Sequence, residues 1–69
     1  MRYHNRVMTS NELQEFMNKH GLSIRELSDI LGVTTGAIHH WLSGIRKVSV
    51  TSSRLMRLFD KYPRLLEEF

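Results

Sequence analysis

Two adjacent histidines, His39 and His40, are the residues of this chain with the clearest capacity for chemistry. Imidazole side chains bind metals, transfer protons and donate hydrogen bonds. Neighbouring residues on a helix point about 100° apart, so these two side chains cannot chelate one ion. The chain also has no cysteine that would complete a thiolate site. We therefore expect no metal and no cofactor.

Catalysis is not predicted either. Serine, histidine and acidic residues all occur, but no nucleophile elbow, glycine-rich phosphate loop or carboxylate pair is visible. A chain of 69 residues has little room for a substrate pocket. We expect a binding protein and not an enzyme.

Length and composition narrow the class further. Sixty-nine residues make at most one domain, whose small core favours oligomerisation. No apolar run approaches the roughly 18 residues of a membrane span, and the first eight residues lack the apolar segment of a signal peptide. These features, with the absence of cysteine, predict a cytoplasmic protein without a membrane association.

The basic residues are unevenly distributed along the chain. The net charge is +3, yet residues 30–59 contain four basic residues and no acidic one. A stretch of this kind is expected to give its surface a positive potential, for which the phosphate backbone of a nucleic acid is the commonest partner.

The histidines belong to a stretch, residues 23–44, that reads as two short helices joined by a tight turn at Gly32. A serine capping box predicts the start of the first helix, and Gly44 predicts the end of the second. Apolar side chains at helical spacing would lock the two helices together: Leu27, Leu31, Val33, Ile38 and Trp41. The second helix, near residues 34–43, would then present a polar face made by Thr35, Gly36, His39 and His40.

Further helices are predicted on both sides of this pair, and no segment alternates like a strand. A capping box at Thr9 starts a helix that runs to about residue 19 and ends at Gly21. A later helix covers about residues 51–61, and a short one covers residues 63–69. The apolar stripe expected on the later helix is Leu55, Leu58, Phe59 and Tyr62. The fold class is therefore all-α, a compact bundle of four to five short helices.

Residues 1–8 show no periodicity and are expected to form a flexible arm. Its basic residues Arg2, His4 and Arg6 are candidates for DNA contact, as in other basic arms. The alternative is a frayed terminus without a role.

The C-terminal helices, residues 49–69, have two interpretations. Four apolar residues either complete the core of the monomer or form the seam of a two-fold dimer: Met56, Leu65, Leu66 and Phe69. The dimer is favoured, because a domain with so small a core is expected to oligomerise.

The stretch LSIRELSDILGVTTGAIHHWLSGIRK, residues 22–47, resembles the Cro-like, lambda-repressor-like helix-turn-helix family. The resemblance extends over about residues 9–59, and small phage and mobile-element regulators, including repressors encoded beside anti-CRISPR genes, are similar in layout. It implies a homodimer that binds double-stranded DNA at an operator, with the second helix of the motif in the major groove. Transcriptional repression and autoregulation are the implied functions.

The resemblance also implies contact residues. Thr35, Gly36, His39 and His40 would face base edges. The phosphates would be contacted by Ser23, Arg25, Thr34, Ser43, Arg46 and Lys47. The chain departs from the family at the base-reading positions, where long Gln or Arg side chains are common, so the resemblance does not imply a base preference.

Three other functions remain open at this point. An antitoxin would use the C-terminal helix to bind its toxin. A protein-interaction module would reuse the helix-turn-helix fold without DNA, although a reading face that lacks acids argues against this. RNA binding is less well supported, because few aromatic residues are present to stack on bases.

Overall fold

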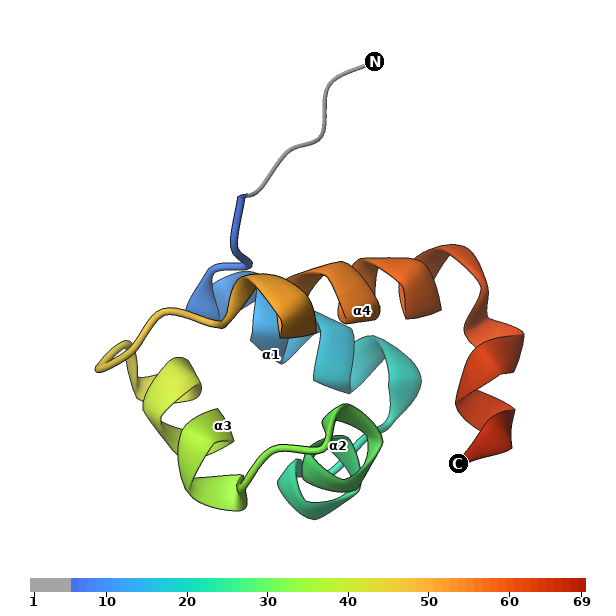
Figure 1. Ribbon diagram of the computed structural model, residues 1–69, viewed down its shortest axis with the longest axis horizontal. Helices are drawn as coiled ribbons and strands as arrows, with labels where there is room; N and C mark the ends of the chain where they lie inside the picture. The colour runs from blue at the N-terminus through green and yellow to red at the C-terminus, as the bar shows by residue number, and fades with distance from the viewer. Residues whose placement is uncertain (1–5) are drawn as a thin grey trace.

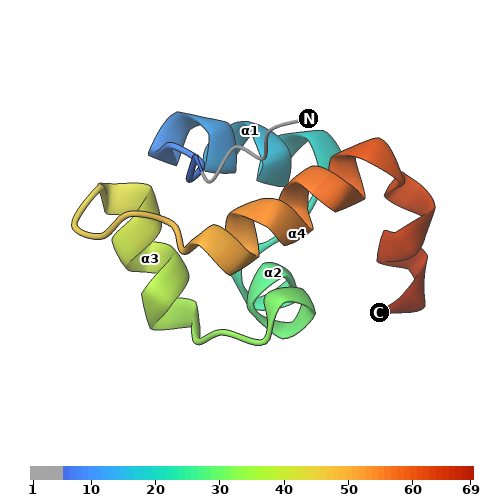
Figure 2. The ribbon, with the colours of Figure 1, turned by 45° about the horizontal axis from the view of Figure 1, so that its top comes forward.

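The computed structural model describes residues 6–69, which fold into four α-helices and a final 3₁₀ helix. The elements are α1 (Ser10–His20), α2 (Ile24–Leu31), α3 (Thr35–Ser43), α4 (Val50–Lys61) and η1 (Pro63–Glu68). In Figure 1, α1 and α4 lie above α2 and α3, and η1 descends from the end of α4. Figure 2 keeps α3 and η1 at opposite ends of the molecule. The all-α bundle expected from the sequence is confirmed.

Polar side chains and glycines fix where the helices begin and end. At the start of α1, the Thr9 hydroxyl accepts a hydrogen bond from the Glu12 N–H at 3.1 Å, and the Glu12 carboxylate accepts one from the Thr9 N–H at 2.9 Å. Ser23 and Glu26 repeat this capping box at the start of α2. Each box satisfies two N–H groups that the first turn of a helix leaves without a partner.

The core is built from ten buried apolar side chains, drawn from four helices, the segment before α1 and the loop between α3 and α4. They are Met8, Leu13, Phe16, Met17, Leu27, Ile38, Trp41, Val48, Met56 and Phe59. Burying a side chain of this size stabilises a fold by about 1.5–3 kcal/mol. Such a small core leaves the stability sensitive to each of its members.

The register of α4 differs from the sequence prediction. The buried side of this helix is formed by Ser52, Ser53, Met56 and Phe59, with Leu55 half-buried. Leu58 and Tyr62, which were expected in the stripe, are 43% and 51% exposed. The predicted stripe was wrong at Leu58 and Tyr62, because Ser52, Ser53 and Met56 turn to the buried side instead. Ser53 is fully buried, and its hydroxyl accepts a hydrogen bond from the Met8 N–H at 2.9 Å.

Because Met8 donates this hydrogen bond, the flexible arm predicted over residues 1–8 is too long. Met8 was placed in the flexible segment, but its side chain is only 7% exposed and belongs to the core. The Arg6 carbonyl accepts a hydrogen bond from the Arg57 guanidinium, which joins this segment to α4 a second time. Residues 6–8 are therefore part of the folded domain.

A small polar cluster joins the end of α1 to the end of α4. The Asp60 carboxylate lies 2.8 Å from His20 Nε2 and 3.3 Å from Lys19 Nζ. The His20 ring also packs against Phe16, with 4.6 Å between the ring centroids, and its side chain is only 9% exposed. His20 therefore bridges two helices.

The last predicted helix is present as a short 3₁₀ segment. Pro63 occupies its first position, and the Phe69 ring packs edge-on against Phe59 with 5.7 Å between the centroids. Proline fits the start of a helix because its missing N–H would have no partner there.

Three carboxylates should make the fold sensitive to acid. The Thr9 backbone N–H and then Arg6 lower the pKa of Glu12 below its ordinary 4.5, and the Ser23 backbone N–H does the same for Glu26. Burial raises the pKa of Asp60, but hydrogen bonds from His20 and Lys19 lower it by more, so it lies below the ordinary 3.8. A depressed carboxyl pKa stabilises the folded state above the unfolded-state value, and this stability is lost as the pH falls through the folded-state value.

We therefore expect the melting temperature to fall as the pH drops from 5 toward 3. The double variant Glu12→Gln, Glu26→Gln should lose less over this interval, because the amides cannot take up the proton yet can still accept the capping hydrogen bond. Thermal melts by circular dichroism measure both proteins. The exposed Glu15→Gln variant is the matched control, and a double variant that loses as much as the wild type would contradict the assignment.

Candidate nucleic-acid interface

The geometry of the candidate site begins at the turn between α2 and α3. Gly32 adopts a left-handed conformation with φ of 70°, which a residue with a side chain adopts at a cost. The N–H groups of Gly32 and Val33 both donate to the Ser28 carbonyl, at 2.9 and 3.1 Å. The turn therefore redirects the chain between the two helices and fixes the angle at which α3 leaves α2 (Figure 1).

Buried side chains hold α3 in this position. Ile38 is fully buried and Trp41 is 5% exposed, so the inner side of α3 packs into the core. Ser28, a small residue of α2, is also buried and is 5% exposed. The other expected locking residues, Leu31 and Val33, are half-buried.

The outer side of α3 carries the four residues predicted to read bases. Thr35, Gly36, His39 and His40 are all exposed, and their spacing along the helix places them on one face. The first turn of α3 contains no acidic residue. Figure 2 shows α3 at the edge of the molecule.

Thr34 has a structural role at the start of α3. Its hydroxyl accepts a hydrogen bond from the Ala37 N–H at 3.1 Å, so it is the N-cap of the helix. The Thr34 side chain is exposed. Its hydroxyl proton is therefore still able to donate to an external oxygen while the oxygen holds the cap.

The basic loop is attached to the other end of α3. Gly44 ends the helix with φ of 83°, and the Arg46 N–H then donates to the His40 carbonyl at 3.2 Å. The Ser43 hydroxyl donates to the same carbonyl at 3.1 Å. Arg46 and Lys47 are both exposed. Two cations are thus held beside the C-terminal end of the face that carries the histidines.

The start of α2 is less favourable for phosphate than the sequence suggested. The Ser23 hydroxyl and N–H are both engaged with Glu26, whose carboxylate occupies the positive end of the helix dipole. Arg25 lies 3.8 Å from Asp29, but both side chains are more than 70% exposed and such a pair is weak. Arg25 can therefore turn toward another anion, whereas a phosphate near Ser23 would meet the Glu26 charge.

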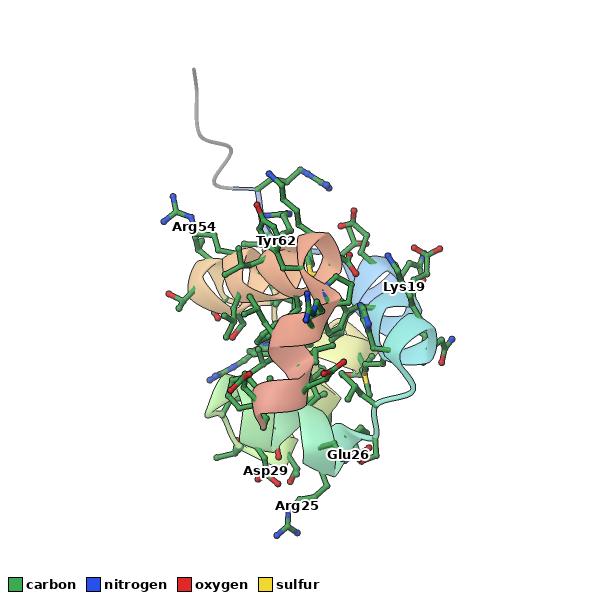
Figure 3. All side chains as sticks on the ribbon, turned by 90° about the vertical axis from the view of Figure 1, so that its right-hand side faces the viewer. Lys19, Arg25, Glu26, Asp29, Arg54 and Tyr62 are labelled. Atoms are coloured by element: carbon green, nitrogen blue, oxygen red, sulfur yellow. The ribbon has the colours of Figure 1, made fainter. Side chains whose placement is uncertain are left out.

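The acid-free stretch of the sequence does not form one basic face. Figure 3 shows Arg54 at the α4 side of the molecule, while Arg25, Glu26 and Asp29 lie at the opposite side, on α2. Arg57 donates to the Arg6 carbonyl, away from α3. Of the four basic residues in this stretch, only Arg46 and Lys47 follow α3 directly. Neighbours in sequence diverge because α4 runs back across the core.

Of the three basic residues predicted to contact DNA from the arm, the structure describes one. Arg2 and His4 lie outside the described residues. Arg6 is described, and its guanidinium pairs with the Glu12 carboxylate, with 3.1 Å between Nη2 and Oε2. This pair is largely exposed, with 61% and 35% of the two side chains accessible.

The four residues predicted for a dimer seam are divided by the structure. Met56 is fully buried in the monomer, so it completes the core and cannot meet a partner. Leu66 is half-buried, while Leu65 and Phe69 are 38% and 69% exposed. Sequence reasoning missed Leu58 and Tyr62, two further exposed apolar residues of this part of the chain, because it had assigned both to the core.

Two other properties can be stated for residues 6–69. No group of three histidine or acidic side chains lies close enough together to hold a metal ion. None of the helices is both long and apolar enough to cross a membrane.

The comparisons with known proteins agree with this geometry. A helix-turn-helix family model matches residues 13–68, most of the chain, from the middle of α1 to the end of η1. No curated protein and no solved structure matches the chain. The chain therefore belongs to the Cro/C1-type helix-turn-helix family of DNA-binding transcription regulators.

Proposed function

We propose that this protein is a homodimeric repressor that occupies a two-fold-symmetric operator in double-stranded DNA. The observation that carries the proposal is the exposed face of α3, which the Gly32 turn projects from the core and which lacks acidic residues. Occupying an operator that overlaps a promoter blocks transcription without any further domain. A repressor that binds its own promoter in this way also regulates itself.

The contacts within each half-site divide into two kinds. Thr35, Gly36, His39 and His40 face the base edges in the major groove, where sequence is read. Phosphates are contacted at both ends of α3 and from α2, by Thr34, Ser43, Arg46, Lys47 and Arg25. Ser23 is left out of this set, because the Glu26 carboxylate at the same helix end repels phosphate.

The dimer seam is proposed at the C-terminal end of the molecule. Leu58, Tyr62, Leu65 and Phe69 are exposed apolar residues on α4 and the segment that follows it. Apolar side chains gathered on a small domain favour association. This end lies away from α3 (Figure 1), so a partner bound there leaves both reading helices free.

Selection from a random duplex library, with sequencing of the retained DNA at low and physiological salt, tests the function. We expect an enriched two-fold-symmetric site whose half-sites are about one turn apart. Weak retention that is independent of sequence and disappears at higher salt would contradict the repressor. A protein that retains no DNA at either salt concentration would support the interaction module instead.

The basic loop should control the electrostatic part of binding. Arg46→Ala and Lys47→Ala should each weaken binding to all DNA sequences, and each should reduce the slope of log K against log salt by about 1. Fluorescence anisotropy at four or five salt concentrations measures the slope. Lys19→Ala, which removes the same charge from the far end of α1, is the control and should leave the slope unchanged. Equal slopes for all three variants would rule out a phosphate contact from the loop.

The seam makes a separate prediction. Leu58→Asn combined with Leu65→Asn should raise the dimer dissociation constant by roughly tenfold or more, because exposed apolar contacts are lost while the monomer core is unchanged. Sedimentation equilibrium measures the constant, and Ile45→Asn, an equally apolar residue that is 73% exposed in the loop, is the control. A double variant that remains as dimeric as the wild type would place the seam elsewhere. A monomeric wild type that copurifies with a second small protein would favour the antitoxin.

A further inference from the structure

The conformation of the chain explains three of its four glycines. Gly21, Gly32 and Gly44 each end a helix with a positive φ, where a side chain is strained. Gly36 is different, because it lies in the first turn of α3 without a positive φ. A β-carbon added there would meet only Thr34 Oγ1, at an ordinary contact distance of 3.8 Å. Neither the backbone nor the packing of the monomer requires glycine at this position.

A glycine that neither the backbone conformation nor the packing requires still weakens its helix. Alanine is the better helix former, so Gly36 lowers the stability of a helix only nine residues long. Glycine is also the residue that allows the closest approach of a backbone to a ligand. The reason for Gly36 is therefore expected outside the monomer, on the exposed side of α3.

The neighbours of Gly36 indicate how close that approach must be. The first turn of α3 begins with Thr34, Thr35, Gly36 and Ala37, and none of these side chains is longer than threonine. Thr34 is engaged as the cap, and Ala37 is half-buried. The outward surface of this turn is then the Gly36 α-carbon and the Thr35 side chain. A partner reaches the Gly36 α-carbon only when it lies against the backbone of α3.

The proposed operator offers one group that fits such a surface. The C5-methyl of thymine is the apolar group that bases present in the major groove. The Gly36 α-carbon and the Thr35 methyl are apolar and leave space where a β-carbon would stand. We infer that Gly36 is a specificity-determining residue, whose missing side chain accommodates a thymine methyl in each half-site. This inference rests on the proposed function, in which α3 enters the major groove.

The test combines Gly36→Ala with a change in the DNA. The operator obtained by selection is resynthesised with deoxyuridine at each thymine in turn, which removes only the methyl group. At one thymine of each half-site, Gly36→Ala should cost roughly tenfold or more in affinity, and deoxyuridine there should restore most of this loss. Thymines elsewhere in the operator are the matched controls, because replacing them should not rescue the variant. The variant should also melt roughly 2–8 °C higher than the wild type, because alanine favours the helix.

Each outcome decides the assignment. A Gly36→Ala variant that binds the operator as tightly as the wild type overturns the inference while the repressor proposal stands. A loss that no deoxyuridine relieves overturns the thymine contact in the same way. A wild type that selects no sequence overturns both proposals. The melting temperature separates these results from misfolding, because a destabilised variant melts below the wild type.

Discussion

The angle between α2 and α3 is the constraint on which the rest of this structure depends. One glycine sets it, since Gly32 with φ of 70° allows two successive N–H groups to reach the same Ser28 carbonyl. A side chain at this position would strain the turn, although there is open space around it. With the angle fixed, Ile38 and Trp41 point into the core, and the polar residues of α3 must point out. The interface is thus a consequence of how the core is closed.

Two independent features of α3 favour the binding of a nucleic acid. Its first turn carries no acid, and its last turn is joined to a basic loop through the hydrogen bond from Arg46 to the His40 carbonyl. The start of α2 has the opposite character, because the Glu26 carboxylate already neutralises it. DNA would therefore be held mainly along α3 and the loop after it. The rest of α2 acts as a support, which resembles the usual division between reading and positioning.

Most of the fold could be predicted from the sequence, since its boundaries depend on local chemistry. The capping boxes at Thr9 and Ser23 and the helix-ending glycines were identified correctly because they act within a few residues of themselves. The register of α4 was not identified correctly, because the buried Ser53 hydroxyl has its hydrogen-bond partner at Met8, 45 residues away in sequence. Met8 is likewise buried in the core, whereas Leu58 is 43% exposed. The spread of the basic residues over two sides of the molecule also depends on tertiary structure, which a linear charge count does not contain.

Helix α3, which we propose reads the bases, is held at its C-terminal end and capped at its N-terminal end by hydrogen bonds within the monomer. At its C-terminal end, the Ser10 hydroxyl donates to the Trp41 carbonyl at 2.7 Å, and the loop bonds to the His40 carbonyl. At its N-terminal end, the exposed residues are a glycine and a short threonine, which have almost no side-chain entropy to lose. In the proposed complex, the entropy lost on binding comes mainly from the side chains of the histidines and of the loop cations. The backbone of α3 is already held in place within the monomer. A surface of this kind discriminates by fit, because it has few long side chains that could adjust to a wrong sequence.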